Sequence, residues 1–106
     1  MLLKNFGESL EIGGKVFTVG DRILANDVSD YEGLYGKITE IKTDPDKDTD
    51  NEGIDIHVRF EIPENKEMIK KIEEKFSKLY GEPKTIDEIP LDLVIMAADE
   101  LEIINK

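Results

Sequence analysis

The chain has 106 residues, which suits a single domain because domains of this kind commonly run to roughly 100–150 residues. It carries 25 acidic and 14 basic residues, a net charge of −11, and no cysteine. This charge argues against nucleic acid and anionic membranes as direct partners, because both are bound through Lys and Arg. The lack of cysteine excludes disulfides and thiolate chemistry and fits a cytoplasmic protein. The longest apolar run, 93–98, is too short to span a membrane.

The first predicted element is a β-hairpin. Two stretches with strand-forming residues, 9–12 and 15–19, flank Gly13 and Gly14. Both glycines tolerate the positive φ values that a two-residue hairpin turn requires. The pair Gly20–Asp21 then marks a turn, at which the hairpin is expected to end.

Two further strands and a long connecting loop follow the hairpin. Residues 22–25 are short and apolar enough to enter a core, and residues 37–42 form the next predicted strand. In that strand Ile38 and Ile41 are three positions apart, which breaks regular alternation and predicts a bulge or a strong twist. The segment 26–36 is rich in Asn, Asp, Ser and Gly, and we expect it to be an ordered loop.

An acidic segment precedes the most regular strand of the chain. Residues 43–53 carry five carboxylates and one Lys, so mutual repulsion predicts a mobile loop. Residues 55–61 alternate cleanly between polar and apolar side chains. The apolar ones are predicted to face the core, whereas the polar ones, Asp55 and His57 among them, are predicted to face outwards.

The second half of the chain is predicted to contain one long helix. Asn65 is a suitable N-cap, apolar residues recur at helical spacing over 66–80, and Gly81 is a suitable C-cap. Thr85 and Glu88 have the spacing of a capping box, which predicts a single helical turn. The last expected elements are a strand at 91–96, a helical turn at 97–100 and a strand at 101–104.

These elements predict a mainly β protein of the α+β class. It has five or six short strands and one amphipathic helix, about residues 66–80, inserted before the last two strands. A parallel α/β layer is excluded because it needs a helix between successive strands. We therefore expect a small curled sheet or barrel with the helix covering one open side.

Two stretches resemble the first two strands of SH3-like small barrels of the KOW and Tudor type. They are 19–24 (Val-Gly-Asp-Arg-Ile-Leu) and 31–41 (Tyr-Glu-Gly-Leu-Tyr-Gly-Lys-Ile-Thr-Glu-Ile). Segment 96–102 resembles the one-turn helix and the last strand of such barrels. The resemblance implies an SH3-like small barrel in which the 66–80 helix is an insertion between the third and fourth strands.

Two other stretches, 24–27 (Leu-Ala-Asn-Asp) and 79–85 (Leu-Tyr-Gly-Glu-Pro-Lys-Thr), are similar to a family of small uncharacterised proteins of bacterial mobile genetic elements. This resemblance implies an accessory role for such an element. It supplies no mechanism.

The candidate binding residues lie in the loop that, in SH3-like barrels, edges the ligand groove. Tyr31 and Tyr35 have the acidic neighbours Asp30 and Glu32. Aromatic rings beside carboxylates can hold a basic or methylated side chain through cation–π contact. A basic protein or peptide is therefore the expected partner. The alternative is that the two tyrosines cover the open end of the barrel.

The acidic loop is a candidate calcium site. Oxygen ligands at positions 1, 3, 5, 7, 9 and 12 surround Ca²⁺ in the helix-loop-helix motif. Carboxylates stand at these six positions, which are Asp44, Asp46, Asp48, Asp50, Glu52 and Asp55. However, Thr49 occupies the position that needs glycine, and no helix is predicted on either side. The alternative is a solvated loop that attracts cations only weakly.

No residue pattern predicts catalysis. His57 is the only histidine, and no serine lies in a Gly-x-Ser-x-Gly turn, so no catalytic residue is assigned and His57 is expected to make a cross-strand polar contact. We expect a non-enzymatic interaction or accessory module, without a cofactor unless Ca²⁺ binds, that is a monomer or a weak homodimer. The alternatives are an acidic decoy that mimics DNA and a calcium-responsive module.

Overall fold

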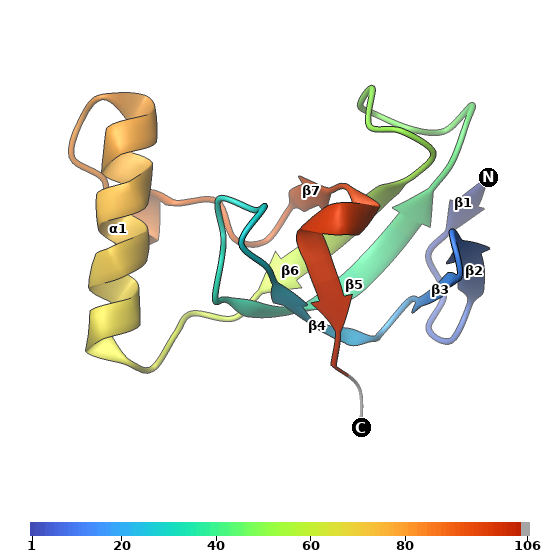
Figure 1. The fold of residues 1–106 in the computed structure, drawn as a ribbon, viewed down its shortest axis with the longest axis horizontal. Coiled ribbons are helices and arrows are strands. Elements are labelled where there is room, and N and C mark those ends of the chain that lie inside the picture. The colour runs from blue at the N-terminus through green and yellow to red at the C-terminus, as the bar shows by residue number, and fades with distance from the viewer. Residues whose placement is uncertain (105–106) are drawn as a thin grey trace.

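The computed structural model describes residues 1–104. This part of the chain is mainly β, with eight strands, one α-helix and two one-turn 3₁₀ helices (Figure 1). The strands are β1 (Leu2–Leu3), β2 (Ser9–Ile12), β3 (Lys15–Thr18), β4 (Arg22–Ala25), β5 (Tyr35–Lys42), β6 (Asp55–Phe60), β7 (Val94–Met96) and β8 (Leu101–Ile103). The helices are α1 (Lys66–Tyr80), η1 (Ile86–Glu88) and η2 (Ala98–Glu100). No helix in this part is long and apolar enough to cross a membrane.

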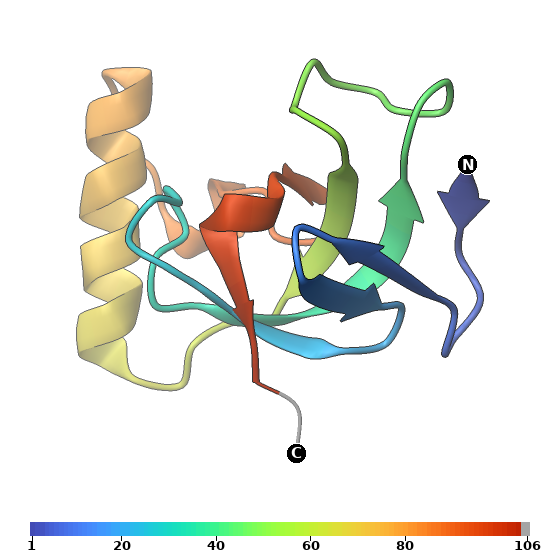
Figure 2. The same cartoon turned by 45° about the vertical axis from the view of Figure 1, so that its right-hand side comes forward.

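The strands form one antiparallel sheet and one separate hairpin. The larger sheet has the order β7-β6-β5-β4-β8, and β1 pairs with the end of β5. The outer strands of this order are β7 and β8, so the sheet is open. Helix α1 lies at one end of the molecule and the β2–β3 hairpin at the other, with the sheet between them (Figures 1 and 2).

Several predicted elements are confirmed. The β2–β3 hairpin turns through Gly13 and Gly14, which have φ values of 57° and 85°. The pairing of β5 with β6 shifts register between Ile38 and Glu40, where a bulge or twist is predicted. Helix α1 spans the predicted residues, and the side chain of Asn65 caps its first turn.

The expectation of five or six strands is too low. Strand β1 consists of two residues that pair with the end of β5, and no local pattern marks so short a strand. The predicted strand at 91–96 is also too long, because regular pairing begins only at Val94. Leu93 points away from the core with 82% of its surface exposed.

The apolar core is formed mainly by residues of the strands and the segments between them, and α1 packs against one end of it. Alternate residues of β6, namely Ile56, Val58 and Phe60, are buried as predicted. Helix α1 contributes Ile72 and Phe76 to the same core. The amphipathic stripe of the helix therefore attaches it to the sheet, as is usual for a helix with one apolar face.

Tyr31, in the loop between β4 and β5, joins the helix to the sheet. Its ring stacks on Phe60 with 4.8 Å between centroids and also contacts Phe76 at 5.0 Å. Its hydroxyl donates a 2.7 Å hydrogen bond to the carbonyl of Pro90. Burial is the main cause that raises the pKa of Tyr31 to about 12. The loop, the sheet and the helix thus meet at one side chain.

The substitution Tyr31→Phe keeps the ring and removes the hydroxyl. We expect the free energy of unfolding to fall by about 1 kcal/mol, because the Pro90 carbonyl loses its donor. Urea denaturation measures this change. Tyr80→Phe, on a half-exposed ring, is the control and should change stability by less than about 0.5 kcal/mol.

The raised pKa of Tyr31 predicts a loss of stability in alkali. The folded protein holds the phenol proton above the ordinary pKa of 10.0, where the unfolded chain releases it. The contribution of the Tyr31 phenol to the free energy of unfolding is complete below pH 10.0. It is lost as the pH rises through the folded pKa of about 12. Urea denaturation at increasing pH should show the decline in the wild type. If the Tyr31→Phe variant declines as steeply, another group is responsible.

Candidate functional site

The structure separates the residues of the predicted tyrosine site. Tyr31 is committed to the core contacts described above, and Asp30 lies exposed beside it. Tyr35 is 42% exposed and lines a pocket at the start of β5. Glu32 lines a different pocket, against α1. Of the two tyrosines, only Tyr35 therefore presents ring surface to a surface pocket.

The Tyr35 pocket lies between the start of β4 and the segment that follows β6. Its volume is about 250 Å³, and it is lined by Arg22, Gly33, Leu34, Tyr35, Glu61, Ile62, Pro63 and Glu64. The guanidinium of Arg22 stacks over the Tyr35 ring at 4.7 Å from the centroid. Arg22 Nε also lies 3.6 Å from Glu61 Oε2. An aromatic ring and a carboxylate thus hold one guanidinium together.

Backbone hydrogen bonds position this pocket. The N–H of Glu61 donates to the carbonyl of Tyr35 at 2.8 Å, which sets the glutamate beside the ring. The adjacent N–H of Phe60 donates to the carbonyl of Leu91 at 2.7 Å. The segment leaving β6 is therefore held on one side by β5 and on the other by the chain that leads into β7.

A second pocket lies on the Leu91 side of the same segment. It has a volume of about 210 Å³ and is lined by Phe60, Ile62, Ile86, Asp87, Ile89, Leu91 and Asp92. Five of these side chains are apolar and the two charged ones are aspartates. We call this the isoleucine groove. Ile62 lines both this groove and the Tyr35 pocket.

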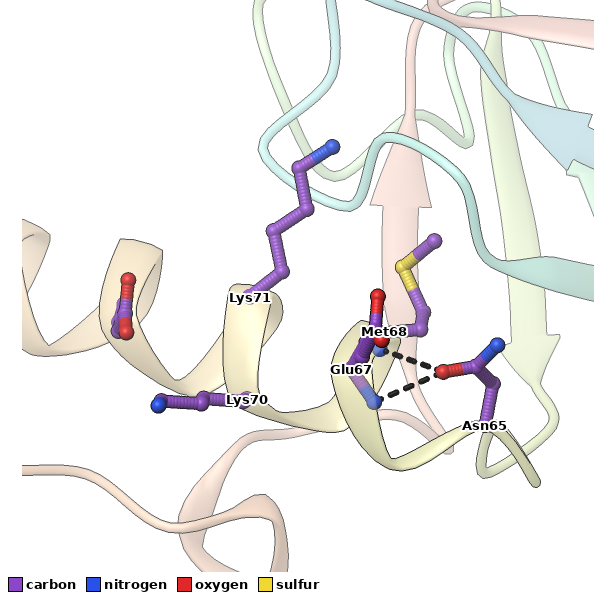
Figure 3. A pocket seen from close by; sticks show the side chains of 6 residues that line it. Asn65, Glu67, Met68, Lys70 and Lys71 are labelled. Atoms are coloured by element: carbon purple, nitrogen blue, oxygen red, sulfur yellow. Dashed lines mark hydrogen bonds between the residues drawn. The ribbon is translucent and has the colours of Figure 1, made fainter.

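The pockets on helix α1 have a different electrostatic character. One lies along the first turns of the helix and includes Lys70 and Lys71 (Figure 3). The other, of about 230 Å³, lies between α1 and the β4–β5 loop and contains Lys71, Lys75 and Lys78. Glutamates line both pockets as well, two in each, but the lysines equal or outnumber them, so neither pocket has the excess of negative charge that complements a basic ligand.

The acidic loop is folded over the start of β6, and this corrects the predicted orientation of Asp55. Asp55 is fully buried. Its carboxylate accepts hydrogen bonds from the N–H groups of Asp48 and Thr49 at 2.7 and 3.0 Å, and from the Thr49 hydroxyl. Burial alone raises the pKa of Asp55, but these hydrogen bonds outweigh it and lower the pKa below its ordinary value. Asp55 therefore holds the loop in place.

His57 is covered by the same loop instead of facing outwards as predicted. Its side chain is 14% exposed, and Nε2 lies 3.4 Å from Asp48 Oδ2. Lys42 Nζ donates to the same carboxylate at 2.8 Å, and this hydrogen bond raises the pKa of Lys42. Part of the repulsion expected in the loop is thus offset by Lys42 of β5.

The six proposed calcium ligands do not converge on one point. Asp46 pairs with the terminal amino group of Met1 at 2.8 Å. Within residues 1–104, the one group of three potential metal ligands is formed by Asp48, Asp55 and His57, whose donor atoms lie within 4.8 Å of one another. Calcium takes six to eight oxygen ligands. Here both carboxylates already bind the loop backbone or Lys42, so the arrangement is better suited to stabilising the loop.

No family model, curated protein or solved structure matches this chain. Its functional interpretation therefore depends on the geometry and electrostatics of its own residues.

Removing the Asp55 carboxylate should release the acidic loop. In Asp55→Ala the donors on Asp48 and Thr49 lose their acceptor, and we expect a loss of about 2–3 kcal/mol in the free energy of unfolding. Because the folded pKa is lowered, the wild-type stabilisation is complete above the ordinary value of 3.8 and declines as the pH falls through the folded pKa.

Urea denaturation at neutral pH and at a series of acidic pH values checks both statements. Asp50→Ala, which removes an exposed carboxylate of the same loop, is the control and should change stability by less than about 0.5 kcal/mol. Equal effects of the two variants at neutral pH would contradict the role of Asp55.

Proposed function

We propose that the protein is a non-enzymatic protein-interaction module built on an SH3-like small barrel, and that it binds an arginine side chain of a basic partner in the Tyr35 pocket. The observation that carries this proposal is the position of Arg22. Its guanidinium lies over the Tyr35 ring and beside Glu61. An arginine from a partner would make the same two contacts.

The strand order supports the barrel. Strands β4, β5, β6 and β7 follow one another as an antiparallel meander, and β8 pairs with the other edge of β4. The one-turn helix η2 precedes the last strand, and α1 is inserted between the third and fourth strands of this set. These features agree with the resemblance found in the sequence.

The electrostatics support a basic ligand. The chain has a net charge of −11, which attracts cations at long range and accelerates encounter with a basic partner. Within the pocket, Glu64 adds a second carboxylate to that of Glu61. The pocket volume of about 250 Å³ falls below the roughly 300–1,000 Å³ of small-molecule sites, so it suits one side chain of a larger partner.

Arg22 is placed to compete with such a ligand. We propose that this half-exposed side chain moves aside and leaves the ring and Glu61 to an incoming guanidinium. A site that its own chain occupies part of the time has a lower apparent affinity. Removing Arg22 should therefore strengthen binding, whereas removing Tyr35 should weaken it.

We would titrate ¹⁵N-labelled protein with the capped peptide Ac-Gly-Arg-Gly-NH₂ and follow amide chemical shifts. The peptide with citrulline in place of arginine is the control, because it keeps the shape and loses the charge. We expect arginine-dependent shifts at Tyr35, Glu61 and Glu64. Tyr35→Ala should weaken binding by at least about threefold, in keeping with loss of a cation–π contact.

Arg22→Ala should bind the peptide at least about threefold more tightly, as removal of a competitor requires. The matched control is Lys37→Ala, which makes the same change of charge at an exposed residue paired with Arg22 across the strands. It should bind like the wild type. Shifts spread over the acidic loop and unchanged in Tyr35→Ala would contradict the proposed site.

A further inference from the structure

The Tyr35 pocket and the isoleucine groove lie on the two sides of one segment. Ile62 lines both, and 62% of its surface is exposed. Two backbone hydrogen bonds fix this segment. The N–H of Glu61 donates to the carbonyl of Tyr35, and the N–H of Phe60 donates to the carbonyl of Leu91. A ligand seated in one pocket therefore passes directly over Ile62 to reach the other.

The isoleucine groove has the chemistry of a subsite for an aliphatic side chain. Its available apolar surface comes mainly from the exposed Ile62 and the half-buried Ile86, whereas Ile89 and Leu91 are almost fully buried. Covering such apolar surface is favourable in proportion to the area removed from water. The volume of about 210 Å³ again suits a side chain better than a separate small molecule.

The charged residues of the groove indicate what flanks that side chain. Asp87 and Asp92 line it, and no basic residue does. These two carboxylates face the same ligand as Glu61 and Glu64 of the neighbouring pocket. A ligand segment with positive charge close to its aliphatic residue would find complementary carboxylates in both pockets.

From the proposed function we infer that the ligand is a basic peptide segment of a partner protein that carries an aliphatic residue next to its arginine. The arginine occupies the Tyr35 pocket and the aliphatic side chain occupies the isoleucine groove, with Ile62 between them. Recognition of two side chains by adjoining pockets sets both the composition and the spacing of the sequence that is bound.

The test compares capped peptides in which zero to three glycines separate a leucine from an arginine, in both orders. In matched peptides glycine replaces the leucine. We expect at least one spacing to bind about threefold more tightly than its leucine-free counterpart, by NMR titration. Intermolecular nuclear Overhauser effects should connect the leucine methyl groups to those of Ile86 and Ile89.

Ile62→Ser should abolish the gain in affinity that leucine gives. Because Ile62 also lines the Tyr35 pocket, the leucine peptide and the leucine-free peptide are both measured on the variant and their affinity ratio is compared with that of the wild type. Leu93→Ser is the matched control, because it removes an exposed leucine that lies outside the groove lining, and it should retain the gain. Both positions are exposed, so both variants should fold.

The two proposals fail in different ways. If the arginine peptides bind at Tyr35 but leucine adds no affinity at any spacing, the two-pocket inference is overturned and the Tyr35 site stands. The inference is also overturned if leucine still increases the affinity of Ile62→Ser and no nuclear Overhauser effect connects the leucine to Ile86 or Ile89. If arginine and citrulline peptides bind equally, the Tyr35 site itself is wrong.

Discussion

The packing of the Tyr31 ring is the interaction on which the positions of the loop, the sheet and the helix depend. The ring lies against Phe60 of the sheet and Phe76 of the helix, and its hydroxyl holds the chain at Pro90. One side chain from the β4–β5 loop thus connects three segments that are far apart in sequence. Tyr35, four residues later, lies at the surface with 42% of its area exposed.

The charges of the protein are unevenly distributed, and their distribution determines which surfaces complement a basic ligand. Helix α1 is the basic part of a strongly acidic chain, with lysines around both of its pockets. The acidic loop is held by Asp55 and partly neutralised by Lys42. The two pockets beside Ile62 combine uncovered apolar surface with carboxylates. They are therefore the surfaces to which we assign the proposed basic partner.

Local patterns predicted much of the fold and little of the site. Helix α1 and strand β6 follow from periodicity, and the hairpin follows from Gly13 and Gly14, because each signal lies within a few residues. The burial of Asp55 depends on a loop folding back over it, which its polar character does not indicate. The pocket requires Arg22 and Glu61 to meet at Tyr35, and this depends on the registers of β4 and of the segment after β6.

The hydrogen bond between Phe60 and Leu91 also bears on how the architecture tolerates change. Strand β6 ends at Phe60, and Leu91 lies three residues before β7, so the insertion that contains α1 begins and ends at adjacent points of the fold. Lengthening such an insertion costs little chain entropy, since the closure penalty grows only slowly with loop length. The sheet can therefore carry insertions of different size at this point, on the condition that each one supplies an apolar residue to cover Tyr31.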